Sequence, residues 1–152
     1  SLIGDIVKIL YTEILREKEG GVYSPMVYSS YDINNDKWNL VYFLQTNEEQ
    51  SAKMLQFAED IFVNLLKEGA TADQFNRVKG AMLSQYENSV RTNSYWHNNI
   101  RLYELLGKDL ITEQRSAIEN LTLEDFNAFM RTLYDGSNRI QVNMHGVSTN
   151  VK

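Results

Sequence analysis

Apolar residues near the start of the chain recur with the period of an α-helix. They are Ile3, Ile6, Val7, Leu10 and Ile14. This spacing places them on one face, as in a helix that packs on a core. The pattern predicts a helix that ends near Glu17, because Gly20 and Gly21 supply the positive φ angles that stop a helix.

The two segments that follow are rich in aromatic and β-branched residues, as strands are. They are "VYSPMVYSSYDI" (residues 22–33) and "WNLVYFLQT" (residues 38–46), and the polar residues "NNDK" (34–37) lie between them. This arrangement predicts a β-hairpin. Pro25 lacks a backbone N–H, so it belongs at a strand start or on a sheet edge.

Two N-terminal capping patterns mark the next two helices. Asn47 with Gln50 begins one helix, which Gly69 closes, and Thr71 with Gln74 begins another. The first carries a broad apolar stripe of Met54, Leu55, Ala58, Ile61, Phe62, Leu65 and Leu66. The second carries Phe75, Val78, Met82, Tyr86 and Val90. Both stripes are predicted to face the core.

Helical spacing continues beyond these two segments. A fourth helix is predicted to begin around Ser94, and its residues Trp96, Ile100 and Tyr103 are predicted to face inward. Thr122 caps another helix, which carries Phe126, Phe129, Met130 and Leu133 and ends at Gly136. From Arg139 to Val147 the residues Ile140, Val142 and Met144 alternate with polar neighbours, which predicts a final strand.

The predicted order is α-β-β-α-α-α-β, in which the stretch around Ser94 is not counted separately. It favours an α+β domain of two layers, with helices packed on a mostly antiparallel sheet. We expect one domain over residues 1–147 and a tail, "STNVK", over 148–152. Three strands make a small sheet, so we expect further strands from a preceding segment of a longer polypeptide, or self-association through an open sheet edge.

Composition narrows the classes of function. The 152 residues include no cysteine, and they carry a formal net charge of -5 with a pI near 5.0. A nucleic-acid or anionic membrane partner is therefore not expected, and thiol chemistry is excluded. With no apolar run near the ~20 residues of a membrane span and no leader pattern, we expect a soluble protein of the cytoplasm or the periplasm.

Most familiar catalytic or metal-binding motifs are missing. His97 and His145 do not form a zinc-binding pattern, so no metal site is expected in this chain. The loop "DINNDKW" resembles a calcium loop, but Lys37 and Phe43 stand where glycine and glutamate are required, which favours a solvated hairpin turn. No serine has a histidine partner in a nucleophile motif.

Arg16 and Tyr23 form the one pair with a distinct chemical meaning. Arginine offers a rigid fork of donors for carbonyl or carboxylate oxygens, and tyrosine joins an apolar ring to a hydroxyl, so both suit peptide binding. They flank Gly20 and Gly21 and could converge on one spot. The alternative is structural: an ion pair of Arg16 with Glu13 or Glu19 and a half-buried Tyr23.

The segment "ILREKEGGVYS" resembles the carboxy-terminal half of the pitrilysin or insulinase type zinc metallopeptidases, the M16 family, with its pattern Leu-Arg-Glu-x-x-Gly-x-x-Tyr-Ser. Similar family segments follow in order: "EEQSAKMLQFAEDIFVNLLKEG", "TADQFNRVKGAML", "NSYW" and "LTLEDF". The resemblance implies two halves that enclose a chamber, each of two α+β domains. It also implies zinc in the missing amino-terminal half, bound by His-x-x-Glu-His and a glutamate.

By the same resemblance, Arg16 and Tyr23 are substrate-binding residues, and Tyr23 stabilises the transition state of peptide hydrolysis. The implied partners are a peptide substrate and the amino-terminal half of the same enzyme, and the chain alone should be inactive. Two alternatives stay open. One is a catalytically inactive structural or interaction domain of an M16-like chamber or a processing-peptidase-like complex. The other is a free-standing domain that binds peptides by strand addition at a sheet edge.

Overall fold

The computed structural model describes residues 1–32, 35, 37–107, 109–133 and 140–144 of the chain. The elements are α1 (Leu2–Tyr11), a π-helix η1 (Thr12–Lys18), β1 (Met26–Asp32), β2 (Lys37–Phe43), α2 (Glu48–Glu68), α3 (Ala72–Ser89), α4 (Asn93–Leu106), α5 (Gln114–Asn120) and α6 (Leu123–Thr132). Apart from its final strand, the predicted order matches this sequence of elements only roughly. The predicted first helix is α-helical in its first part and π-helical in its second, and the short helix α5 was not predicted.

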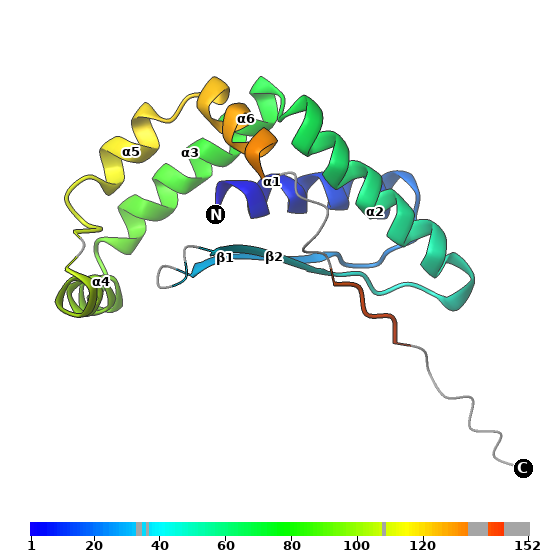
Figure 1. The fold of residues 1–152 in the computed structure, drawn as a ribbon, viewed down its shortest axis with the longest axis horizontal. Helices are drawn as coiled ribbons and strands as arrows, with labels where there is room; N and C mark the ends of the chain where they lie inside the picture. Colours follow the sequence, from blue (N-terminus) through cyan, green and yellow to red (C-terminus); the bar gives the residue numbers. More distant parts are fainter. Residues whose placement is uncertain (33–34, 36, 108, 134–139, 145–152) are drawn as a thin grey trace, which may run out of the picture.

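The helices and the sheet form two layers, which confirms the predicted α+β class. Figure 1 shows α1 and the arch of α2, α6, α3 and α5 on one side of the β1–β2 hairpin, with α1 between the hairpin and the arch; α4 lies beyond the turn end of the hairpin. Helix α1 contacts β1 on one side and α2 and α3 on the other. None of the helices in the described ranges is both long and apolar enough to cross a membrane.

The hairpin is antiparallel, and its register pairs Met26 with Phe43 at the open end and Asp32 with Lys37 at the turn. Side chains alternate between the two faces of a strand, so one face packs on the helices and the other does not. The face toward the helices carries Val27, Leu40, Tyr42 and Trp38, which pack against the core. The opposite face carries exposed apolar side chains, which are Met26, Tyr28, Val41 and Phe43.

The core lies where α1 and η1 meet α2, α3 and α6. Its largest fully buried side chains are Tyr11, Ile6, Leu15, Met54, Met130 and Val7. The predicted stripe of α2 is confirmed: four of its members are buried, and Ile61 and Phe62 pack against the core. The predicted caps at Asn47, Thr71 and Thr122 are also confirmed, since each side chain accepts a hydrogen bond from the backbone N–H three residues on.

The prediction for α4 is wrong in its choice of face. Trp96, Ile100 and Tyr103 are exposed, whereas the half-buried side chains are Tyr95, Asn99, Leu102 and Leu106. The two stripes are neighbours on the same helix and both contain apolar residues, so helical periodicity alone does not choose between them.

The predicted final strand is not observed in the part that the structure describes. Residues 140–144 have no sheet pairing, and the side chains of Ile140, Val142 and Met144 are 91%, 78% and 90% exposed. Alternation of apolar and polar residues suits a strand but supplies no partner edge, and the ladder needs one. The predicted helix end at Gly136, the rest of the predicted strand and the tail 148–152 lie outside the described residues.

The core assignment predicts the effect of shortening one leucine. Leu65→Ala removes a side chain that is only 3% exposed, so we expect the free energy of unfolding to fall by about 2–5 kcal/mol. The matched control is Leu105→Ala on α4, where the leucine is 67% exposed and the expected change is below about 0.5 kcal/mol. Urea denaturation of both variants measures the difference, and equal losses would show that the α2 stripe is not core.

Candidate functional site

Arg16 projects from the π-helix η1, directly after the most deeply buried residue of that segment. Leu15 has no exposed surface and fixes η1 to the core, while Arg16 is exposed. The π-helical turn closes with the bond from the Glu19 backbone N–H to the Ile14 carbonyl (2.9 Å), five residues back. Such turns carry one extra residue per turn and so re-aim the side chains within them, and they occur frequently at functional sites.

The turn after η1 brings the chain from Arg16 to Tyr23. The carbonyl oxygen of Leu15 accepts hydrogen bonds from the backbone N–H groups of Gly21 (3.1 Å) and Val22 (3.3 Å). Of the two glycines in this turn, Gly20 has a positive φ (+63°) and Gly21 does not, so the expectation that both would have one is wrong for Gly21. Gly21 has a different role: a Cβ atom there would collide with the side chain of Met54 in the core.

Two hydrogen bonds join this turn to the segment that leads from β2 to α2. The Thr46 hydroxyl donates to the Gly21 carbonyl (2.6 Å), and the Tyr23 backbone N–H donates to the Gln45 carbonyl (3.4 Å). The β1–β2 register, extended outward, sets these segments opposite each other. The position of Tyr23 is therefore fixed by the hairpin as well as by η1.

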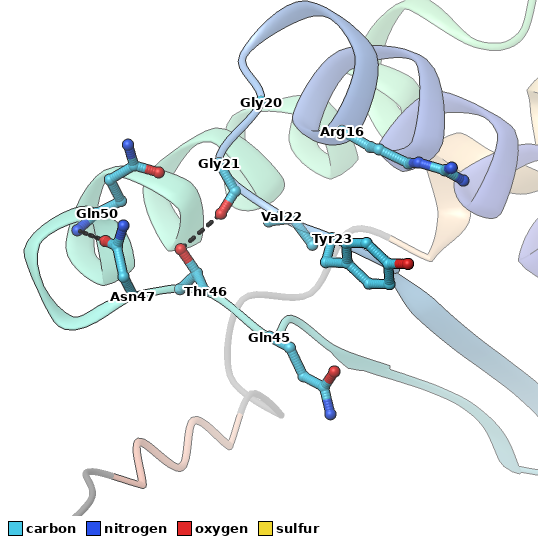
Figure 2. Close-up of a pocket in the computed structure, with 9 residues that line it drawn as sticks. All are labelled: Arg16, Gly20, Gly21, Val22, Tyr23, Gln45, Thr46, Asn47 and Gln50. Carbon is cyan, nitrogen blue, oxygen red and sulfur yellow. Dashed lines mark hydrogen bonds between the residues drawn. The ribbon is translucent and has the colours of Figure 1, made fainter.

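Arg16 and Tyr23 line one open hollow with a volume of about 510 Å³, as the sequence suggested they could. Its other lining residues are Gly20, Gly21, Val22, Gln45, Thr46, Asn47 and Gln50. In Figure 2 the side chains of Arg16, Tyr23 and Gln45 extend toward the same side, and those of Asn47 and Gln50 lie away from them. The sequence analysis named only Arg16 and Tyr23 as site residues. The lining residues after β2 could have been found only from the hairpin pairing, which places Gln45 opposite Tyr23.

The alternative interpretation, an ion pair of Arg16 with a nearby glutamate and a half-buried Tyr23, is wrong. Glu13 pairs with Arg77 (3.2 Å) and Glu19 with Lys53 (3.2 Å), so the two expected partners of Arg16 are both engaged by other cations. Within the described ranges Arg16 has no carboxylate within 4.0 Å and no side-chain hydrogen bond. Tyr23 is not half-buried but 84% exposed. The site thus presents an unneutralised cation beside an exposed phenol.

No zinc site is found among the residues that the structure describes. In the part of the chain that the structure describes, no group of three His, Cys, Asp or Glu side chains could hold a metal ion. His97 is exposed on α4, and His145 lies outside the described residues. The calcium-like loop is a hairpin turn in its described part, where the side-chain amide of Asn35 donates to Asp32 (2.7 Å).

Comparison with known proteins decides the family. The family model described as "Peptidase M16 inactive domain" matches residues 2–82, which is more than half of the chain. The chain belongs to this M16 family. The resemblance drawn from the sequence is therefore confirmed, and the domain is of the non-catalytic M16 type. No curated protein sequence matches the chain.

Solved structures share the M16 fold with this chain. The periplasmic protease PqqL from Escherichia coli matches with a TM-score of 0.68 and 20% identity, over 84% of this chain and 15% of that chain. The ferredoxin protease FusC, in complex with Arabidopsis ferredoxin, matches with a TM-score of 0.70 and 16% identity, over 88% of this chain and 15% of that chain. A conserved protein from Enterococcus faecalis matches with a TM-score of 0.66 and 17% identity, over 86% and 31%.

These matches show two things about the M16 domain. At such identities they establish its fold alone. The chain also spans only 15% to 31% of the length of the three matched chains.

The space around two glycines predicts opposite effects on stability when each is replaced by alanine. Gly21→Ala forces the buried Met54 side chain to move, so we expect a loss of about 1–3 kcal/mol in the free energy of unfolding. Gly80→Ala, where the new methyl group meets open space on α3, should instead stabilise by about 0.5–1 kcal/mol. Thermal or urea unfolding measures both, and a harmless Gly21→Ala would refute the tight packing of the turn on α2.

Proposed function

We propose that this chain is the substrate-contacting, non-zinc domain of an M16 zinc peptidase of the pitrilysin or insulinase type. The observation that carries the proposal is the state of Arg16 and Tyr23. They line one hollow, both are exposed, and Arg16 forms no ion pair with the residues that the structure describes, although Glu13 and Glu19 lie close to it in sequence. Water satisfies the hydrogen-bonding groups of such exposed side chains, and a bound peptide can replace that water without breaking any bond within the described part of the fold.

Arg16 would hold the substrate main chain. Its guanidinium has five N–H donors and no acceptor, which matches the carbonyl oxygens of an extended peptide. Because no carboxylate within the described residues competes for it, the donors remain available to a ligand. A protein substrate is the class supported by FusC, which was solved with a ferredoxin bound.

Tyr23 would act on the reacting carbonyl group. Negative charge builds on that oxygen when a peptide bond is attacked, and a preorganised hydroxyl donor lowers the barrier by stabilising it. The turn at Gly20 and the bond from Tyr23 N–H to the Gln45 carbonyl hold the residue in place before substrate arrives. Its hydroxyl makes no hydrogen bond to any part of the chain that the structure describes, so it is free to donate.

The hydrolytic water and the metal would belong to the amino-terminal half of the parent protein. When bound there, zinc supplies the activation of that water. This chain contributes the two donors described above and by itself should hydrolyse nothing. A parent of the periplasm fits the proposal, since PqqL is a periplasmic protease; a cytoplasmic parent stays a prediction from the sequence.

An interaction domain without a catalytic role is the second candidate. It is favoured by the exposed apolar side chains on the outer face of the sheet, Met26, Tyr28, Val41 and Phe43. Both edges of the hairpin are also unpaired within the described residues, so strand addition or self-association would be possible there. In this case Arg16 and Tyr23 would not affect turnover.

The proposal predicts a kinetic signature for one hydroxyl. In the full-length parent protein, Tyr23→Phe should lower kcat about 10²- to 10³-fold and leave KM nearly unchanged, because the lost bond forms only in the transition state. The control is Tyr103→Phe, at an exposed tyrosine on α4. An effect confined to KM would contradict the proposed role of Tyr23.

Reconstitution tests the domain as a whole. A mixed peptide library is incubated with this chain alone and together with the amino-terminal half, with zinc and with a chelator. We expect cleavage only in the combination, only without chelator, and reduced by Arg16→Ala. If a folded, zinc-loaded combination cleaves nothing, the interaction domain is the better description.

A further inference from the structure

We infer that Gln45 is a third substrate-contacting residue of this hollow and that its side-chain amide binds a main-chain amide of the peptide. The inference rests on the proposed function, since it concerns the same site. It adds a recognition element that depends on the peptide backbone and not on the substrate's side chains. It also assigns a role to the end of the hairpin, which lies outside the segment "ILREKEGGVYS" that contains Arg16 and Tyr23.

The hairpin holds Gln45 beside Tyr23. Gln45 lies two residues beyond the end of β2, and its carbonyl oxygen accepts the backbone N–H of Tyr23 (3.4 Å). The alternation of β2 continues past its end, so Leu44 is half-buried and Gln45 exposed. Gln45 lines the same hollow as Arg16 and Tyr23, and in Figure 2 its side chain extends toward the same side of the view as theirs.

The side chains of the next two residues form hydrogen bonds within the fold, whereas the Gln45 side chain forms none with the described residues. The Thr46 side chain bonds the Gly21 carbonyl, and the Asn47 side chain caps α2 by accepting from the Gln50 N–H (2.8 Å). The Gln45 side-chain amide makes no hydrogen bond to the residues that the structure describes. The backbone bond fixes where the Gln45 side chain begins, and the exposed amide, which is hydrated in the free protein, is available to a ligand.

The three exposed side chains divide the hydrogen-bonding groups of a peptide between them. A peptide unit presents one acceptor and one donor. Arg16 can only donate, so it can engage carbonyl oxygens but not N–H groups. Gln45 carries both an acceptor oxygen and an NH₂ donor, so it can pair with the N–H and C=O of an extended chain that passes Tyr23.

The test measures peptide binding separately from turnover. The parent protein is treated with chelator, and the affinity for a short fluorescein-labelled peptide of β-casein is measured by anisotropy. Gln45→Met keeps the length of the side chain and removes its amide, and we expect the Kd to rise about 3- to 10-fold, as for the loss of one or two hydrogen bonds. The matched control is Gln85→Met, at an exposed glutamine on α3, which should leave the Kd unchanged.

Peptides that each carry one N-methyl group on a main-chain nitrogen locate the contact. One of these peptides should bind the unchanged protein more weakly than the unmethylated peptide does. For that peptide, Gln45→Met should cause no further rise in the Kd, because the contact is already lost. Circular dichroism confirms that the variants are folded.

The outcomes separate the inference from the proposed function. If Arg16→Ala weakens binding and Gln45→Met does not, the inference is wrong and the proposed function stands. If neither variant weakens binding, the substrate-contacting function fails as well. Equal losses for Gln45→Met and Gln85→Met would also overturn the inference, because the effect would then not be local.

Discussion

The structure depends on the burial of Tyr11. This side chain has no exposed surface, its hydroxyl donates to the Ala58 carbonyl on α2 (2.9 Å), and its ring meets Tyr42 of β2 edge-on at 5.3 Å. It therefore joins α1, α2 and the sheet at one point. Tyr11 is also the last residue of α1, directly before η1 begins. Leu15, which is fully buried one turn later, fixes the other side of the π-helical segment.

The site is a consequence of these two anchors. With Tyr11 and Leu15 both held in the core, the residues between and after them must follow the geometry of η1, and Arg16 leaves the core on the side of the hollow. Glu13 and Glu19, close to it in sequence, reach Arg77 and Lys53 instead. An exposed ion pair contributes little to stability, so the fold has little need of a partner for Arg16.

The sequence predicted those features that depend on neighbouring residues. The caps at Asn47, Thr71 and Thr122 were predicted because a side chain and a backbone N–H three residues on suffice to form them. The π-helix was not, because the spacing of apolar residues over so short a segment does not distinguish a π-helical turn from an α-helical one. The pairing of Arg16 with Tyr23 in one hollow was expected, whereas Gln45 was missed because its place beside Tyr23 depends on the hairpin register.

A non-catalytic domain can still shape catalysis if it supplies groups that a metal centre lacks. Metal activation provides a nucleophile, but it does not by itself fix the peptide in line with that nucleophile. Hydrogen-bond donors that are positioned before binding supply this orientation at little entropic cost, because nothing in the protein must reorganise. Arg16, Tyr23 and Gln45 are exposed on segments that are each anchored to the core or to the hairpin. This anchoring fixes the backbone at the three positions. None of the three side chains bonds to the part of the chain that the structure describes, so under the proposed function their donors and acceptors would be open to a peptide.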